Sequence, residues 1–120
     1  MATIRYLGED IIISIEDGSA PLNMDAMAEI VVHLYTKISD IRKFSKTTRT
    51  GYTKLKRISA TRYDIYLDSN MTKTMNPGTL MFGIRFFQVF SAMPDGYLDD
   101  IAVTSLLELQ DSTLKTETAS

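Results

Sequence analysis

The chain has 120 residues, of which 44% are hydrophobic and 23% are charged, and its formal net charge is -2. This length suits one folded domain, and this composition excludes an intrinsically disordered chain. Because the chain contains no cysteine, a disulfide framework, a thiolate metal site and thiol redox chemistry are excluded.

The first ten residues do not have the composition of a targeting segment. They contain Arg5, Glu9 and Asp10 and no apolar run of signal-peptide length. The apolar runs further along the chain are too short to span a membrane. We therefore expect a soluble protein without a membrane partner.

Alternation of apolar and polar side chains, which is typical of half-buried strands, begins at residues 10–16. Asp-Gly at positions 17 and 18 ends this strand, and residues 20–27 are expected to form a loop with one helical turn. Residues 29–37 alternate again. The positions that share one face in these two strands are Ile11, Ile13, Ile15, Ile30, Val32 and Leu34.

The middle of the chain is more polar. Residues 42–46 and 52–58 are rich in β-forming residues and flank a T-T-R-T-G sequence, which predicts an exposed basic hairpin. Residues 63–68 form a clear strand, followed by a connector at 69–75. The alternating apolar positions of that strand are Tyr63, Ile65 and Leu67.

Asn-Pro-Gly at residues 76–78 is a strong turn signal and precedes the longest apolar stretch, residues 79–90. This stretch contains four of the five phenylalanines, so we expect a central strand. The doubled Phe86-Phe87 interrupts simple alternation and predicts either a bulge or burial on both faces.

The last predicted elements are a turn at residues 93–96 and a strand at 101–109. We therefore predict an all-β, antiparallel two-sheet sandwich of seven or eight strands over residues 1–110, with a polar carboxy-terminal tail at 111–120.

Positive charge is concentrated in the middle of the chain. Residues 37–62 contain nine basic residues and one acid, Asp40, a balance of +8, whereas the rest of the chain carries -10. A domain built in this way should present one basic lobe on an acidic body.

The basic lobe is the main candidate for a binding surface, because Phe44 and Tyr52 are interleaved with its basic side chains. We rank a dock for an acidic protein surface first and a solvated face that prevents edge-to-edge aggregation second. Nucleic-acid binding comes third, because the whole chain is acidic. The candidate protein-docking residues are Arg42, Lys43, Lys46, Arg49, Lys54, Lys56 and Arg57.

The order of short motifs resembles one protein family. L-G-E-D at residues 7–10 precedes a strand, I-V-V-H-L-Y occupies 30–35, and Y-D-I-Y-L-D at 63–68 is followed by N-P-G-T-L at 76–80. This order is similar to that of the immunoglobulin-like amino-terminal domain of tailed-phage baseplate upper proteins. The resemblance implies an adaptor in the capsid, collar or baseplate of a virion assembled in the host cytoplasm. Its partners would be other virion proteins and copies of itself.

Residues suited to catalysis or metal binding are few. His33 is the only histidine, so it lacks the companions that a zinc site or a catalytic triad needs, and we interpret it as structural or interfacial. Asp95, Asp99 and Asp100 surround Gly96, where we favour a plain turn over a calcium site or an acid/base pair. We predict no enzyme activity, no metal and no cofactor.

A stand-alone binding module is the alternative function. In a carbohydrate-binding β-sandwich, exposed aromatic rings form a flat platform for the ligand. Tyr35, Tyr66 and Tyr97 are the candidates. Exposure of the three rings on one face would favour this alternative.

Overall fold

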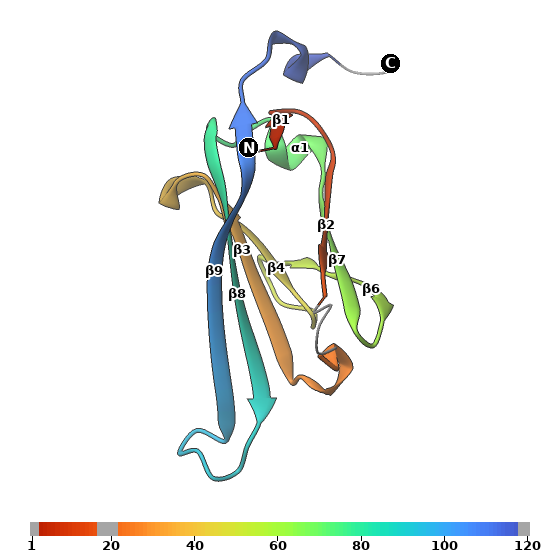
Figure 1. Cartoon of the computed structure of the whole chain (residues 1–120), viewed down its shortest axis with the longest axis vertical. Coiled ribbons are helices and arrows are strands. Elements are labelled where there is room, and N and C mark those ends of the chain that lie inside the picture. The colour runs from red at the N-terminus through yellow and green to blue at the C-terminus, as the bar shows by residue number, and fades with distance from the viewer. Residues whose placement is uncertain (1–2, 17–21, 118–120) are drawn as a thin grey trace.

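The computed structural model describes residues 3–16 and 22–117, in which nine strands form two sheets (Figure 1). The strands are β1 (Ile4–Tyr6), β2 (Ile11–Ile15), β3 (Glu29–Tyr35), β4 (Arg42–Ser45), β5 (Thr53–Lys54), β6 (Lys56–Ser59), β7 (Arg62–Leu67), β8 (Gly78–Val89) and β9 (Tyr97–Gln110). The helical turns are η1 (Met24–Ala26), η2 (Ile38–Asp40), α1 (Ser69–Thr72) and η3 (Thr113–Thr116). None of these described helices has the length and apolar character needed to cross a membrane.

The larger sheet has six strands in the order β1-β9-β8-β3-β4-β5, and the smaller sheet has the order β2-β7-β6. Figure 1 shows the smaller sheet facing one side of the larger sheet, so the two sheets form the layers of a sandwich. We call the side of the larger sheet that is turned away from the smaller sheet the outer face.

Apolar side chains from both sheets fill the space between them. Ile30, Val32 and Leu34 alternate along β3 and are fully buried, and Ile65 and Leu67 do the same along β7. Burial of such side chains is the main favourable contribution to folding. The inward faces predicted from the alternation of these two strands are confirmed.

The prediction of seven or eight antiparallel strands is wrong in two respects. The described part of the chain contains nine strands, because the short strands β1 and β5 carry no apolar alternation that would reveal them. In addition, β1 pairs in parallel with β9, and β4 pairs in parallel with β5. The direction of these short edge strands depends on the path of the connecting chain, which side-chain alternation does not report.

The prediction of an exposed basic hairpin formed by residues 42–46 and 52–58 is also wrong. β4 and β5 are parallel neighbours in the larger sheet, and the chain then crosses to the smaller sheet, where β6 pairs with β7. The crossing point is Leu55, which is 5% exposed and belongs to the core. Burial of this leucine between two polar strands holds the chain at the place where it changes sheets.

Two explanations were possible for the doubled Phe86-Phe87, a bulge or burial on both faces, and the structure contains no bulge at this position. The pairing of β8 with β9 is regular there, and its register shift lies between Leu80 and Met81. Phe86 packs against the core, whereas Phe87 lies on the outer face and meets the ring of Tyr97 edge to face, with the ring centres 6.4 Å apart. The two phenylalanines are therefore partly buried on opposite faces.

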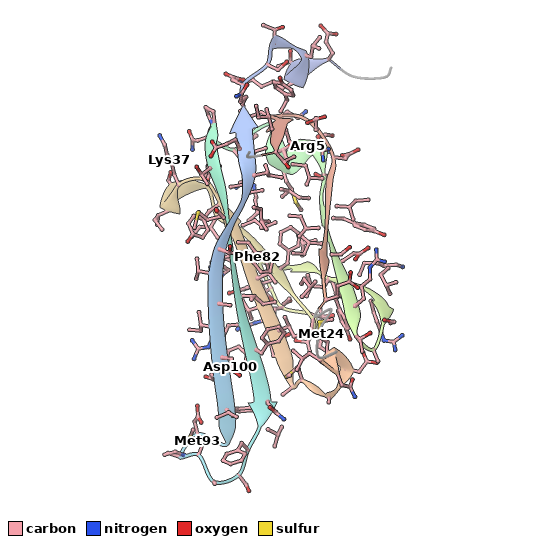
Figure 2. All side chains as sticks on the ribbon, viewed as in Figure 1. Arg5, Met24, Lys37, Phe82, Met93 and Asp100 are labelled. Atoms are coloured by element: carbon pink, nitrogen blue, oxygen red, sulfur yellow. The ribbon has the colours of Figure 1, made fainter. Side chains whose placement is uncertain are left out.

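The described part of the predicted loop at 20–27 contains one short helical turn, η1. Met24 and Met27 are 1% and 8% exposed and pack between the sheets, where Figure 2 labels Met24. These methionines therefore belong to the core. The turn predicted at Asp17 and Gly18 lies outside the described residues.

The tail after β9 folds back on the β1–β2 turn. The carbonyl of Gln110 accepts a hydrogen bond from the Leu7 amide at 2.9 Å. η3 then brings Lys115 against Gly8, where an added Cβ would lie 2.7 Å from the Lys115 Cα. Because Gly8 also has a φ of +94°, this close approach requires glycine.

Candidate functional site

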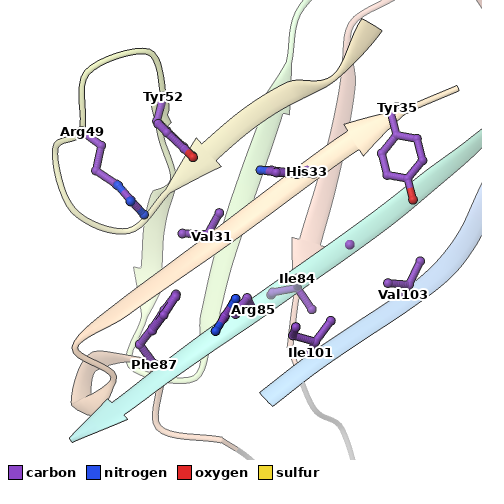
Figure 3. Close-up of a pocket in the computed structure, with 11 residues that line it drawn as sticks. Val31, His33, Tyr35, Arg49, Tyr52, Ile84, Arg85, Phe87, Ile101 and Val103 are labelled. Carbon is purple, nitrogen blue, oxygen red and sulfur yellow. The ribbon is translucent and has the colours of Figure 1, made fainter. Parts of the chain in front are cut away.

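A groove with a volume of about 400 Å³ crosses the outer face over β3, β8 and β9 (Figure 3). Because alternate residues of β3 face the core, Val31, His33 and Tyr35 lie on the outer face. Gly83 of β8 lies opposite His33 and contributes no side chain. The missing side chain leaves the middle of the groove open.

One wall of the groove comes from the chain between β4 and β5. Tyr52 donates its amide to the Arg49 carbonyl at 3.1 Å, which closes a turn that brings both side chains to the groove. The Arg49 guanidinium lies 4.7 Å from the centre of the Tyr52 ring, and the Lys43 ammonium lies 5.6 Å from it. Both cations therefore lie within the distance of a cation–π interaction with one aromatic ring.

Glu29 is an acid that lies beside Arg49 of this wall. Burial alone would raise the pKa of Glu29, but hydrogen bonds from Thr47 and from the Ile30 amide hold it below its usual value. Its Oε2 lies 4.0 Å from Nη1 of Arg49, and the side chain of Arg49 is 42% exposed. At this distance and exposure the ion pair is weak, so Arg49 remains accessible to a partner.

The opposite side of the groove carries a second arginine. Arg85 lies 4.9 Å from the centre of the Phe87 ring and donates to Asp99 Oδ2 at 2.6 Å. Ile101 and Val103 of β9 continue this side and are 67% and 57% exposed. The groove thus combines cations with exposed aliphatic surface.

His33 lies on the floor of the groove. Its Nε2 atom is buried and has no hydrogen-bond partner among the described residues. Burial, and then the nearby charge of Lys43, lower the pKa of His33, so the ring is neutral at neutral pH. This environment agrees with the interpretation of His33 as a structural or interfacial residue, which stays a prediction.

Three of the candidate docking residues are bonded within the fold. Arg42 donates to the Met71 carbonyl at 3.3 Å and to Thr74 Oγ1 at 2.6 Å. Lys46 donates to the carbonyls of Asp25 and Met27 at 2.9 and 2.6 Å.

Arg57 is the third. It binds the Asp25 carboxylate with Nε and Nη2, at 2.9 and 2.7 Å. The bonds from Arg57 and then from Tyr63 lower the pKa of Asp25 to about 2. Burial and the same carboxylate raise the pKa of Tyr63 to about 12. Arg57 therefore fastens η1 to the smaller sheet.

The remaining four candidates are divided between surfaces. Lys43 and Arg49 lie together at the groove. Lys54 is exposed on the edge strand β5, and Lys56 is exposed on the smaller sheet, where it lies opposite Asp64. The single basic lobe predicted from the charge distribution is thus spread over both sheets.

The acidic residues near the β8–β9 turn have ordinary structural contacts. Asp95 accepts a hydrogen bond from the Tyr97 amide at 3.1 Å, as in a turn, and Asp99 pairs with Arg85. No group of three acidic or histidine ligands occurs among the described residues.

The tyrosine platform expected for a carbohydrate-binding module does not form. Tyr35 and Tyr97 lie on the outer face of the larger sheet, by their register with the neighbouring strands. Tyr66 pairs with Ile12 and is 49% exposed on the outside of the smaller sheet. The three rings therefore face opposite sides of the molecule.

Several exposed apolar side chains lie at the end of the β8–β9 hairpin. β3 pairs with β8 only as far as Phe87, so residues 88–98 extend beyond the sandwich, and Figure 2 labels Met93 at this end. Its exposed apolar side chains, with their exposed fractions, are Val89 (67%), Phe90 (46%), Met93 (39%) and Tyr97 (42%). We call this part the hairpin overhang.

The sequence contains a signal for the overhang that alternation alone does not reveal. β8 and β9 span 12 and 14 residues, whereas β3 spans 7. Two long β-forming stretches around a tight turn therefore extend past the shorter strands that would cover them.

No known protein family, curated protein or solved structure matches the chain.

Proposed function

We propose that this chain is a structural adaptor of a phage or prophage virion, an immunoglobulin-like β-sandwich that joins neighbouring proteins of the capsid, collar or baseplate. The observation that carries the proposal is the exposed apolar surface of the hairpin overhang. Exposed apolar side chains that gather in one part of a protein surface are typical of sites that bind another protein.

The groove supports the same proposal. It is lined by Ile101 and Val103 of β9, the strand that also forms one side of the overhang. It is also lined by Arg49 and Arg85, and Lys43 lies near the Tyr52 ring in its wall. Aliphatic side chains supply affinity, and exposed cations select an acidic partner and speed its approach. A partner segment with acidic and aliphatic residues fits this surface best.

The virion context is supported by the order of motifs in the sequence, which resembles the amino-terminal domain of baseplate upper proteins. An adaptor of this kind needs no catalytic group. The overhang and the groove give it a surface for binding a neighbour.

The proposal is tested by purifying particles on a density gradient from cells that produce the chain and counting its copies per particle by mass spectrometry. We expect the wild-type chain to be present in fixed stoichiometry. The double variant Phe90→Ser/Met93→Ser should reduce its copy number at least about tenfold, because each loses apolar contact surface.

The matched control is Ile38→Ser/Leu114→Ser, which removes two apolar side chains that are 77% and 72% exposed elsewhere on the molecule. This control should bind like the wild type. Absence of the wild-type chain from all particles would refute the virion role, and equal loss in both variants would refute the role of the overhang.

A further inference from the structure

Most of the outer edge of β9 has no neighbouring strand. β1 pairs only with the residues from Glu108 to Gln110, so residues 97–105 have no partner on that side among the described residues (Figure 1). Natural proteins protect exposed edges with charged side chains, especially lysine, or with proline, a bulge or a very short strand. The charged side chains of residues 97–105 are Asp99, which pairs with Arg85, and Asp100. The segment contains neither lysine nor proline, and its pairing with β8 is regular.

The hydrogen bonds of the hairpin show which backbone groups point outward. Phe90 donates its amide to the Gly96 carbonyl at 2.8 Å. Because alternate residues of a strand direct their N–H and C=O groups to opposite sides, the regular ladder turns Ala102 toward β8. Ile101 and Val103 then direct their backbone groups to the open edge.

We propose that a second copy of this chain pairs with β9 in an antiparallel manner, about a two-fold axis at Ala102. Such an axis, perpendicular to the sheet, keeps the two outer faces on the same side. It places Ile101 opposite Val103, Asp100 opposite Thr104 and Asp99 opposite Ser105 of the second copy. The larger sheets of the two copies then form one continuous sheet.

The strand is complementary to itself in this register. The aliphatic side chains of Ile101 and Val103, which are 67% and 57% exposed in the single chain, meet across the axis. Both acids face a hydroxyl group that can donate a hydrogen bond to them. The backbone N–H and C=O groups of Ile101 and Val103 point to the open edge. Ile101 of one copy and Val103 of the other can therefore form the two backbone hydrogen bonds of a hydrogen-bonded pair.

Other registers lose this match. An axis at Asp100 brings two carboxylates face to face, and an axis at Ile101 places Asp99 opposite Val103. An axis at Val103 places Asp100 opposite Leu106. Like charges or an acid against an aliphatic side chain destabilise a cross-strand pair, so the sequence of β9 selects Ala102 as the centre and a second copy as the partner.

This pairing rests on the proposed adaptor function and deepens it by naming one partner. The tests use the purified chain alone, so that a failed dimer and an absent virion role are distinguished.

The first test uses the absence of cysteine from the chain. Ala102→Cys places two thiols opposite each other in a non-bonded pair with a Cα separation of about 4.5 Å, within the range of about 4.4–6.8 Å that a disulfide needs. The matched control Thr104→Cys leaves its two thiols about 14 Å apart along the strands. We expect a covalent dimer from Ala102→Cys at least about tenfold more abundant than from Thr104→Cys.

The second test uses charge and sedimentation velocity. In the Thr104→Asp variant, the new carboxylate of each copy lies opposite Asp100 of the other copy, so the dimer contains two pairs of like charges. This variant should weaken the dimer at least about tenfold. Thr104→Lys should keep it, because lysine pairs with the same Asp100. Thr61→Asp makes the same change in the exposed β6–β7 turn and should have no effect.

The far-ultraviolet circular dichroism spectrum establishes that each variant is folded. A wild-type chain that sediments as a monomer up to 0.5 mM, roughly the top of the usual concentration range for such dimers, overturns the proposal. Equal crosslinking of both cysteine variants, or equal sedimentation of Thr104→Asp and the wild type, also overturns it.

Discussion

Asp40 is the buried acid that organises one end of the larger sheet. Its side chain accepts hydrogen bonds from the amide and hydroxyl of Thr36, from the amide of Lys37 and from the amide and side chain of Asn76, at 2.6 to 3.0 Å. Burial alone would raise the pKa of Asp40, but these bonds hold it well below its usual value. One carboxylate thereby joins η2 to the start of β8.

Replacing Asp40 with asparagine should lower the free energy of unfolding by about 2 to 4 kcal/mol at pH 7, measured by urea denaturation. Both carboxylate oxygens of Asp40 accept hydrogen bonds from N–H groups. In the asparagine variant one of these oxygens is replaced by an NH2 group, which cannot accept. In either orientation of the side-chain amide, an N–H donor therefore faces another donor. The matched control Asp95→Asn lies in the exposed β8–β9 turn and should change the free energy of unfolding by less than about 0.5 kcal/mol.

The same variant has a defined pH dependence. Because the pKa of Asp40 is lowered in the folded chain, its stabilisation is present above the unfolded pKa of about 3.9 and is lost as the pH falls toward the folded value. The difference in unfolding free energy between the wild type and Asp40→Asn should therefore be smaller at pH 3 than at pH 7. A constant difference at both pH values would contradict this account.

At the scale of elements, the segment from β4 to β6 connects the two sheets. Lys46 follows β4 and donates to the carbonyls of Asp25 and Met27, next to η1. A basic residue that looks available in the sequence is thus part of the connection between β4 and the turn that enters β3. Lys54, in contrast, is exposed and has no such bond among the described residues.

Lys46→Met should lower the free energy of unfolding by about 1 to 2 kcal/mol, because the methionine keeps the aliphatic stem but cannot donate to the two carbonyls. Lys54→Met should leave it within about 0.5 kcal/mol. Thermal or urea denaturation measures both. Equal stability of the two variants would mean that the Lys46 bonds do not stabilise the fold.

The sequence predicts a strand well where one face of that strand is buried in the core and the other face is not. β3 and β7 alternate because every second side chain enters the core, and that pattern is local. β4 and β5 pair in parallel, and Leu55, which follows β5, is buried in the core. Alternation within such short strands predicts neither of these features. The distribution of charge along the sequence also does not indicate which basic side chains form hydrogen bonds within the fold, as Arg42, Lys46 and Arg57 do.

The candidate site could be predicted only in part for a related reason. The sequence singles out His33, as the only histidine, and Tyr52, among basic residues. The groove that they share is open in the middle because Gly83, which lies opposite His33, has no side chain. The exposure of Ile101 could not be predicted from its own strand, because an apolar residue in an alternating pattern is normally buried. It is exposed because no strand or layer covers that part of the outer face.

At the scale of the whole molecule, the chain combines a two-sheet sandwich with the hairpin overhang, which extends beyond it. The molecule measures 53 × 33 × 26 Å, and the overhang lies at one end of its long axis (Figure 1). The core holds Phe44, which is fully buried, whereas Phe90 in the overhang is 46% exposed. The buried core and the proposed binding surface therefore lie in different parts of the same chain.

Two phenylalanines of opposite environment separate these roles. Phe44→Ala removes a side chain that lies between the sheets and should lower the free energy of unfolding by about 3 to 5 kcal/mol. Phe90→Ala should change it by less than about 1 kcal/mol, since much of that ring is in water in the single chain. Urea denaturation measures both effects, and the particle copy number measures binding. Phe90→Ala should reduce the copy number although the chain is folded, and a large loss of stability in Phe90→Ala would show that the overhang belongs to the core.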